Sequence, residues 1–305
     1  MSRPLRTALG STPLVFEPVP PSVRANPVRS GLQVEELLRL LRSAPRLDAV
    51  NVPELVDENH DGKPYYRTGD IRSFAHTVAE QADREVIVNK VVAHLESAAA
   101  LEGWVRETLD RGIRNVVLVG GSSRYIPYPG PPVLEANRIC HTVLDGVGGL
   151  LGNIAIPQRT GEPNRMIAKT RAGTSFFTTQ ILFDAEGVLR LLRGYERQCR
   201  DSGVPPAAVL LSFAPLADET DAEFVRWLGA DIPEAAERAI LNGDDGSAAA
   251  RSVRRALAVY DEVDRARQAE SWRVPLGINV EQISQRHLPS AVEMLRAFAE
   301  RLGPA

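Results

Sequence analysis

The sequence is poor in the residues that fix a fold through covalent or metal cross-links. It has 2 cysteines, 3 methionines and 3 tryptophans among 305 residues. Cys140 and Cys199 lie far apart, so we expect two isolated thiols in a reducing compartment, with a disulfide between them as the less favoured alternative. The 5 histidines show no metal-ligand spacing, so we predict no metal site. A chain of this length can bury a large core without such cross-links.

Other absences exclude whole classes of protein. No apolar run reaches the roughly 18 residues that cross a bilayer, and no apolar segment of a signal peptide follows the N-terminus. A net charge of −3 gives no electrostatic case for binding nucleic acid. The sequence also lacks a G-x-G-x-x-G fingerprint after its first predicted strand and any G-x-S-x-G nucleophile elbow. We therefore expect a soluble, cytoplasmic protein that acts on small molecules, and solvated charged helix faces favour a monomer.

An alternation of short apolar segments and helical patterns runs through the whole chain. The apolar segments are near-continuous, as in parallel strands covered on both faces. The predicted strands span residues 14–17, 48–52, 85–89, 115–119, 152–156, 175–180, 208–213 and 275–280. The clearest helical patterns span residues 34–42, 101–111, 186–200, 248–269 and 288–302. Eight such units without a dinucleotide fingerprint predict an α/β fold, a single (β/α)8 TIM barrel over residues 1–305 with a short N-terminal extension.

Glu17 stands where a barrel of this kind places its chemistry, at the carboxyl end of the first strand. Pro18 holds it extended, and the apolar neighbours Phe16 and Val19 would partly bury its carboxyl group. Burial raises the pKa of a carboxyl group and suits it to act as a general acid. A carboxylate at a strand end can also cap a loop or pair with an arginine, and the spacing alone leaves both readings open.

Polar residues recur at the same end of the other predicted strands. Each one alone is ordinary loop chemistry, but together they predict a polar mouth on an apolar barrel. Backbone N–H groups in the Gly-Gly-Ser-Ser turn after the fourth strand can bind a phosphate or carboxylate, or can simply close a tight turn. The residues are Asn51, Glu54, Asn89, His94, Gly120, Gly121, Ser122, Ser123, Gln158, Arg159, Gln180, Asn279, Glu281 and Gln282.

Three segments resemble the methylenetetrahydrofolate reductase family. Residues 15–21 are similar to its first strand, with Phe-Glu followed by a proline pair. Residues 111–121 are similar to the segment that leads into its fourth strand, and residues 172–184 to its Ala-Gly-Ala-x-x-x-x-Thr-Gln-x-x-Phe-Asp. Pro157 and His94 also fall in matching places. The resemblance covers nearly the whole barrel and is most specific in the first and third segments.

The resemblance implies folate chemistry with a defined set of roles. Glu17 matches the general acid, which protonates the folate so that its five-membered ring opens to an iminium. Gln180 matches the amide that hydrogen-bonds the pterin. Residues Gly120 and Gly121 match the glycine region of the fourth-strand loop, and His94 and Lys169 match positions near the family's flavin.

The departures from the family pattern lie where the flavin would bind. Gly121-Ser122-Ser123 has no match for the family's aspartate, and Ile156-Pro157-Gln158 stands in place of Tyr-Pro-Glu. We therefore expect a branch without FAD, in which NADH rather than NADPH reduces 5,10-methylenetetrahydrofolate to 5-methyltetrahydrofolate directly. The alternatives are an FAD-dependent reductase with a divergent pocket, a relative using another one-carbon carrier or a deazaflavin, and a non-catalytic folate-binding barrel.

The remaining ligand contacts are assigned by position. Glu54 is expected to take the missing aspartate's hydrogen bonds to the pterin's amino edge. Phe176 or Phe177 is expected to stack on a ring, while the other points into the helix layer. The further residues assigned to the substrate are Asn51, Asn279 and Glu281, and those assigned to the nicotinamide cofactor are His94, Gly120, Gly121, Ser122, Pro157, Gln158 and Lys169.

Overall fold

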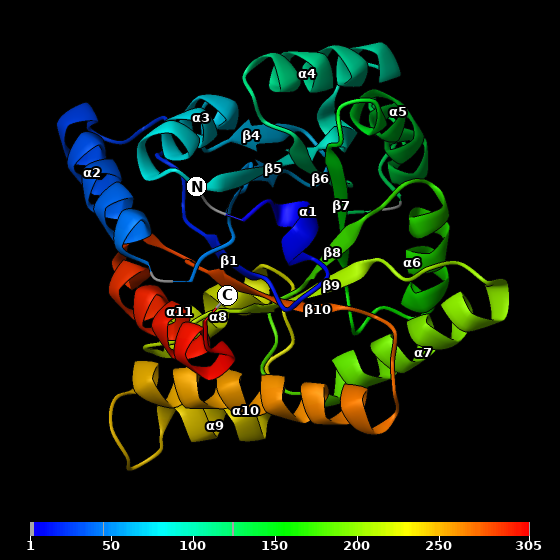
Figure 1. Ribbon diagram of the computed structural model, residues 1–305. Helices are drawn as coiled ribbons and strands as arrows, with labels where there is room; N and C mark the ends of the chain where they lie inside the picture. The colour runs from blue at the N-terminus through cyan, green and yellow to red at the C-terminus, as the bar shows by residue number, and fades with distance from the viewer. Residues whose placement is uncertain (1–2, 45, 124, 305) are drawn as a thin grey trace.

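Eight parallel strands close into a barrel in this computed structural model, which describes residues 3–44, 46–123 and 125–304. The order around the barrel is β1-β10-β9-β8-β7-β6-β5-β2 (Figure 1). The strands are β1 (Leu14–Glu17), β2 (Ala49–Val52), β5 (Glu85–Val91), β6 (Asn115–Val119), β7 (Leu150–Ala155), β8 (Phe176–Thr179), β9 (Ala208–Phe213) and β10 (Leu276–Glu281). Each lies within two residues of a predicted strand, and the single (β/α)8 barrel is confirmed.

The helices form a ring outside the strands (Figure 1). The ring contains α2 (Pro27–Ser43), α3 (Ile71–Ala82), α4 (Ala98–Asp110), α5 (Val133–Asp145), α6 (Glu162–Arg171), α7 (Glu186–Ser202), α10 (Ala248–Ala269) and α11 (Leu288–Leu302). Several begin where a polar side chain accepts a backbone N–H of the first turn, at Asn26, Asp70, Ser97 and Ser247. The last two helices begin and end where the sequence predicts.

The N-terminal extension is part of the core and closes one end of the barrel. Helix α1 (Leu5–Ala8) lies across the amino ends of the strands (Figure 1). Its Leu5 and Ala8 are buried in one apolar cluster with inward-facing strand residues such as Ile87 and Phe176. Apolar packing therefore fills this end of the barrel interior and leaves the opposite end for polar groups.

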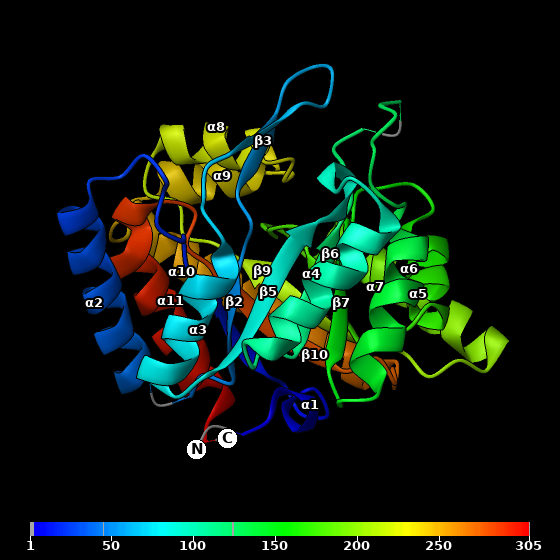
Figure 2. The same cartoon turned by 90° about the horizontal axis from the view of Figure 1, so that it is seen from above.

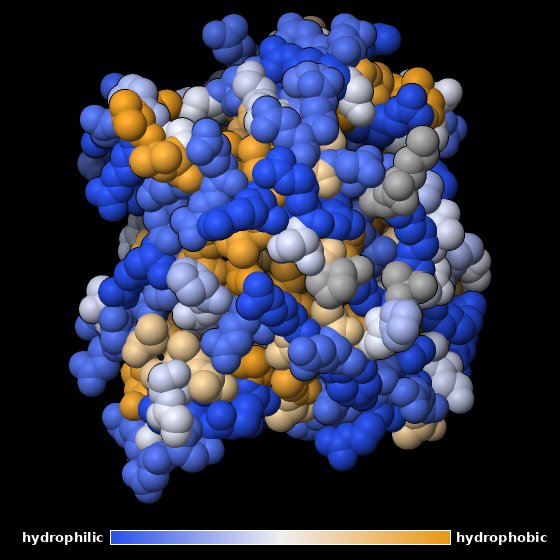
Figure 3. Space-filling view, turned by 60° about the vertical axis from the view of Figure 1, so that its left-hand side comes forward, coloured by the Kyte–Doolittle hydropathy of each residue, from blue (hydrophilic) through white to orange (hydrophobic). Residues whose placement is uncertain are grey.

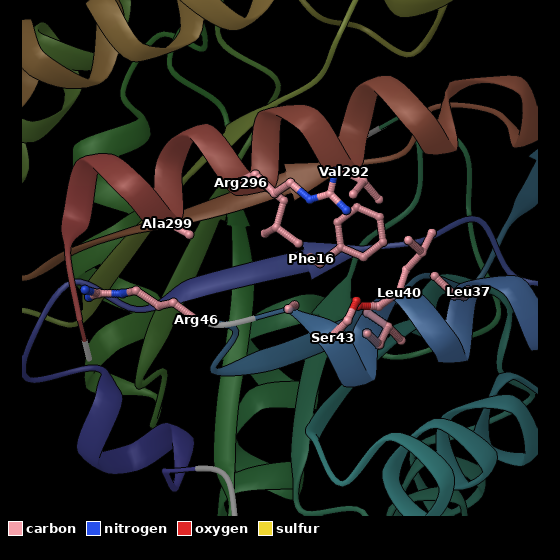
Figure 4. Close-up of a pocket in the computed structure, with 11 residues that line it drawn as sticks. Phe16, Leu37, Leu40, Ser43, Arg46, Val292, Arg296 and Ala299 are labelled. Atoms are coloured by element: carbon pink, nitrogen blue, oxygen red, sulfur yellow. The ribbon is translucent and has the colours of Figure 1, made fainter.

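The space between the strands and the helix ring holds the larger apolar core. Phe16 and Phe177 point outward into it and are fully buried. A gap of about 20 Å³ remains between α2 and α11, lined mainly by apolar side chains including Phe16 and Val292 (Figure 4). The side of the molecule that carries α2 and α11 is mostly hydrophilic, with apolar atoms at the bottom of a furrow (Figure 3). A gap of that size holds about one water molecule, so it is no ligand site.

Three additions stand over the carboxyl ends of the strands. After β2 the chain forms an antiparallel hairpin of β3 (Val56–Glu58) and β4 (Pro64–Tyr66). After β9 it forms α8 (Glu219–Trp227) and α9 (Glu234–Leu241). Figure 2 shows the hairpin projecting from the end of the barrel opposite to α1 and the termini. We call this open end the mouth.

Both cysteines are free and buried. Cys140 belongs to α5 and Cys199 to α7, and each packs in the large core. Among the residues that the structure describes, no helix has the length and apolarity that crossing a bilayer requires.

The plug formed by α1 predicts a stability effect. Leu5→Ala removes a fully buried side chain from the closed end of the barrel, so we expect it to lower the free energy of unfolding by about 2–4 kcal/mol. Leu32→Ala on α2, where the side chain is 62% exposed, should change it by less than about 0.5 kcal/mol. Urea unfolding of both variants measures the difference, and equal effects would show that α1 does not stabilise the barrel.

Candidate active site

A cavity of about 1780 Å³ occupies the mouth of the barrel. Its lining comes from the ends of most strands, from the β3–β4 hairpin and from α8. This is the end at which barrels of this architecture carry their active sites, because the loops after the strands converge there. The volume exceeds the roughly 300–1,000 Å³ of a typical small-molecule pocket, so it can hold two ligands or one long ligand.

Two carboxyl groups lie side by side at the base of the cavity. β1 and β10 pair in a register that sets Glu17 beside Glu281. Asn279, two residues before Glu281 on the same face of β10, donates from its Nδ2 to Glu17 Oε2 at 3.0 Å and lies 3.3 Å from Glu281 Oε1. Asn51 donates to the same oxygen of Glu17 at 2.6 Å. The side-chain amide of Asn279 also lies 3.1 Å from the hydroxyl of Ser212.

The environment of this pair favours its protonated forms. Burial raises the pKa of Glu17 to about 7, against the hydrogen bonds from Asn279 and Asn51, which lower it. Burial and the neighbouring charge of Glu17 raise the pKa of Glu281 well above its ordinary value. Two adjacent carboxyl groups cannot both ionise without a large cost, as in other carboxyl dyads. The pair therefore holds at least one proton near neutral pH, in agreement with the general acid expected at Glu17.

Four polar atoms around this base lack a hydrogen-bond partner within the described chain. They are buried oxygens of Asn51, Asn89, Thr178 and Asn279. Asn89 and Thr178 line the cavity, whereas Asn51 and Asn279 are fully buried behind the carboxyl pair. Buried polar atoms nearly always have a hydrogen-bond partner. The two side-chain oxygens that face the cavity without one therefore indicate a ligand with complementary polar groups.

Asn51 and Asn279 therefore differ from the expectation that they touch substrate. Both side chains have 0% exposure, and both donate to Glu17. Their positions explain this, because Asn51 lies one residue before the end of β2 and Asn279 two residues before the end of β10. They hold the acid in place, and ligand contact falls to Glu17 and Glu281, which line the cavity.

Gln180 follows β8 and lines the cavity, where the sequence places it. Its Nε2 donates to the carbonyl of Leu228 at 3.0 Å, and its Oε1 accepts from the backbone N–H of Ile181 at 2.9 Å. The side chain thus ties the end of β8 to the segment after α8. These bonds use one of the two N–H groups and one of the two oxygen lone pairs of the amide, so a ligand can add a hydrogen bond to Gln180 without breaking either.

Glu54 also lines the cavity, but its oxygens already have partners. One accepts from Lys90 Nζ at 2.6 Å and the other from the backbone N–H of Val91 at 2.9 Å. The ammonium group of Lys90 also lies 5.8 Å from the ring centroids of Tyr66 and Trp104. Lys90 is a partner that no sequence pattern indicated, and each oxygen of Glu54 already accepts one hydrogen bond in this arrangement.

His94 is enclosed by neighbours and does not line the cavity. Its side chain is 1% exposed, and its Nε2 lies 2.9 Å from Glu58 Oε1 on the β3–β4 hairpin. The other oxygen of Glu58 accepts from the hydroxyls of Ser122 and Tyr128 at 2.6 Å each. Burial alone would raise the pKa of Glu58, but these hydrogen bonds and the charge of His94 outweigh it and lower the pKa. The network fixes the hairpin to the loop after β6.

The turn after β6 faces the cavity at Gly120, Gly121 and Ser122, yet its conformation serves packing. A Cβ atom at Gly121 would lie 2.2 Å from the ring of Tyr128, so only glycine fits there. The hydroxyl of Ser122 is already bound to Glu58. The turn therefore offers a ligand its backbone surface and no free side chain.

Contrary to expectation, Phe176, Pro157 and Gln158 do not line the cavity, whereas Phe177 confirms the expectation that one of the two phenylalanines points outward. Phe176 is fully buried near α1. Side chains alternate along β8, and this alternation points Phe176 into the barrel interior below the cavity. Phe177 points into the helix layer, edge-on to Tyr195. Pro157 is buried and Gln158 is exposed, and neither lines the cavity, although Ile156 before them does.

Lys169 lines the cavity as expected for a ligand contact. Its Nζ donates to the carbonyl of Ile154 at 2.8 Å and lies 3.7 Å from Glu162 Oε1. Burial lowers the pKa of Lys169, partly offset by Glu162, and the charges of Arg159 and Arg165 lower it further.

Sequence reasoning missed Ser212, Thr178 and Glu58. Ser212 and Thr178 each interrupt an apolar strand with a buried hydroxyl, and that interruption is the signal that could have identified them. Glu58 lies on a three-residue strand that shows no hydrophobic alternation, so no pattern marked it.

Glu17 suits the chemistry of the site, but its buried carboxyl group is expected to lower the stability of the folded chain. Its pKa of about 7 in the folded chain exceeds the ordinary 4.5, so ionising it costs folding free energy that grows as the pH rises from about 4.5 and is complete above about 7. Glu17→Gln removes this cost. Relative to the native chain, we expect it to gain on the order of 3 kcal/mol between pH 4 and pH 8, measured by urea unfolding.

Glu237→Gln on α9 is the matched control with the opposite sign. The hydrogen bond from Arg226 lowers the pKa of Glu237 against a smaller opposing effect of burial, so its stabilisation is present at pH 8 and lost in acid. That variant should lose stability at pH 8 relative to the native chain and not at low pH. A Glu17→Gln variant with no pH-dependent gain would contradict the burial of this carboxyl group.

Comparison with known proteins finds the fold in a solved structure. No protein-family model matches the chain, and no curated protein matches it. An uncharacterized protein from Clostridium thermocellum that binds two copies of 5-methyl-5,6,7,8-tetrahydrofolic acid aligns with a TM-score of 0.78 at 15% identity. The alignment covers 97% of this chain and 99% of that one. The likeness extends over the whole barrel and supports the fold.

Proposed function

We propose that this barrel binds a reduced folate and reduces 5,10-methylenetetrahydrofolate to 5-methyltetrahydrofolate with hydride from NADH. The observation that carries the proposal is the carboxyl pair of Glu17 and Glu281 at the base of a cavity with unmet polar groups. A pterin ring presents several N–H groups and ring nitrogens on one edge, which is the complement that such a base calls for. The similar barrel from Clostridium thermocellum, which binds a methylated tetrahydrofolate, supports the folate part.

The mechanism rests on proton transfer from Glu17. With its pKa at about 7, Glu17 is protonated in about half of the molecules at neutral pH, and the protonated form can give its proton to a nitrogen of the folate's five-membered ring. The carbon–nitrogen bond then breaks with its electron pair on that nitrogen, leaving an iminium at the other nitrogen. Bound NADH would supply the hydride that converts the iminium carbon to the methyl group. Glu17 leaves the step as a carboxylate and regains a proton before the next turnover.

The two buried amides suit both protonation states of Glu17. As arranged, Asn51 and Asn279 donate N–H groups to Glu17 Oε2, which stabilises the carboxylate after proton transfer. Their own side-chain oxygens have no partner within the described chain. Turning an amide over would present that oxygen to the O–H of a protonated carboxyl group. The same two residues thus hold the acid before and after it reacts.

Of the residues assigned to the cofactor, three do not line the cavity, namely His94, Pro157 and Gln158, whereas the turn after β6 and Lys169 do. His94 is closed off by Glu58 and Tyr128, and Gly121 backs onto the Tyr128 ring. Pro157 is buried and Gln158 is exposed, and the cavity lining includes neither. The same residues were assigned to the nicotinamide cofactor, so their positions bear equally on NADH and on a flavin. Direct reduction by NADH therefore rests on the sequence departures at Ser122 and Ile156, and we derive no step through a flavin.

A second candidate is a folate-binding barrel without catalysis. The unmet oxygens of Asn89 and Thr178 serve binding equally well without any hydride transfer. The carboxyl pair favours the enzyme, because a protonated acid that costs stability has no use in simple binding.

The first prediction of the proposal concerns cofactor use. The purified protein should oxidise NADH only when 5,10-methylenetetrahydrofolate is present and without added flavin, followed at the nicotinamide absorption band. A flavin spectrum near stoichiometric occupancy in active protein would overturn direct reduction. Tight binding of 5-methyltetrahydrofolate with no NADH oxidation would favour the binding barrel instead.

The second prediction concerns the acid. Glu17→Gln should lower kcat by about 10²–10⁴-fold, because general acid catalysis contributes on that order. In the native chain, kcat/KM should fall as the pH rises above about 7, as Glu17 loses its proton. Glu300→Gln on the outer helix α11 serves as the matched control and should keep native turnover. Near-native turnover in Glu17→Gln, with unchanged folate binding, would exclude the acid role.

A further inference from the structure

A basic wall faces the cavity on the side opposite Glu17. We define it as Arg159, Arg165 and Lys169, all of which line the cavity at the end of β7 and on α6. In the closed barrel β7 is four strands from β1 in either direction. Eight strands about 4.8 Å apart and tilted by about 36° give a barrel roughly 15 Å across between backbones. The wall and the carboxyl pair therefore lie at two ends of one cavity.

The three cations of the wall share one buried carboxylate. Glu162 has 0% exposure, and its Oε2 lies 3.9 Å from Nη1 of both Arg159 and Arg165. Its Oε1 lies 3.7 Å from Lys169 Nζ. Within the described residues, these are the ion pairs of the three cations, so the wall carries an excess of positive charge. Glu162 Oε2 has no hydrogen-bond partner, which shows that the cations gather round it without being fully neutralised.

The cations keep free donors toward the cavity. The side chains of Arg159 and Arg165 are each 47% exposed. Arg165 is held by a bond from its Nη1 to the carbonyl of Thr160 at 2.7 Å, and Lys169 by its bond to the carbonyl of Ile154. A guanidinium group such as that of Arg159 or Arg165 matches carboxylate and phosphate geometry with two parallel hydrogen bonds. Glu162 offsets part of the positive charge of the wall, and a bound anion would offset more of it.

We infer that Arg159, Arg165 and Lys169 form an anion subsite that takes the charged end of a ligand whose ring lies at Glu17 and Glu281. The inference rests on the proposed function and adds an anionic end to the ring that the ligand places at Glu17 and Glu281. Its chemistry is that of a carboxylate or phosphate at the end of a molecule long enough to cross the barrel. Two sources fit this chemistry, the glutamate tail of the folate and the pyrophosphate of the dinucleotide.

The experiment compares whole ligands with ligands that lack the charged end. Isothermal titration calorimetry on the full chain measures Kd for 5-methyltetrahydrofolate and for its analogue without the glutamate residue. A second pair is NADH and dihydronicotinamide riboside, which lacks the phosphates. The proteins are the native chain, Arg159→Ala/Arg165→Ala, and Arg106→Ala as a control on the outer face of α4, where the side chain is 63% exposed.

The subsite predicts a specific pattern of affinities. One whole ligand should lose affinity by about tenfold or more in the double variant, while its truncated counterpart binds both proteins equally. The ligand affected identifies the source. Raising the salt concentration should weaken that ligand in the native chain and not in the double variant. Arg106→Ala should behave as the native chain does.

Two results would overturn the subsite. Both whole ligands could keep their native Kd within twofold in the double variant, or whole and truncated ligands could weaken equally. If neither folate nor NADH binds the native chain, the proposed function fails. Binding of inorganic pyrophosphate then tests the subsite separately from the proposed function. Pyrophosphate bound by the native chain and lost in the double variant supports it, and no binding to the native chain refutes it. Arg159→Gln/Arg165→Gln, which keeps side-chain length, replaces the alanine variant if that variant unfolds.

Discussion

The contact between Glu17 and Glu281 is the constraint on which the site depends. Parallel pairing of β1 and β10 sets the two carboxyl groups side by side, and burial raises the pKa of each. The barrel can tolerate such a pair only because Asn51, Asn279 and Ser212 form a polar layer directly beneath it. Below that layer, the apolar cluster with α1 closes the barrel and keeps water out from behind. The fold thus delivers a protonated acid to the base of an otherwise open cavity.

The side chains that line the cavity differ in chemistry from one side of the barrel to the other. Near the base of the cavity lie neutral amides and hydroxyls with unmet oxygens, and across the barrel lies the basic wall around Glu162. Side chains that looked available in the sequence hold the frame together instead, since Glu54 pairs with Lys90 and His94 with Glu58. These pairs fix the hairpin and the ends of β5 and β6 around the mouth. A ligand with a flat polar ring and an anionic end is complementary to this arrangement.

The sequence predicts the frame of this molecule better than its fine contacts. Eight apolar segments identify the barrel, and polar residues at strand ends identify the mouth, including Glu17, Gln180 and Glu281. Side chains alternate between the two faces of a strand, but a continuous apolar run does not reveal which residues face inward. Phe176 was misplaced for this reason. Lys90 and Glu58 were missed as partners because their pairings join segments more than thirty residues apart, and the short hairpin strands show no hydrophobic alternation. Whether an acid is free or paired depends on such distant contacts.

The central claim is that the carboxyl pair shares protons near neutral pH, and a direct titration tests it. Glutamate labelled with carbon-13 at the carboxyl group gives one resonance per residue, and spectra of Glu17→Gln and Glu281→Gln assign the two that matter. The structure predicts that the Glu17 resonance titrates with a pKa of about 7 and that Glu281 titrates well above the ordinary 4.5. If both resonances titrate below about 5, as exposed glutamates do, the pair is ionised at neutral pH and the acid mechanism is contradicted.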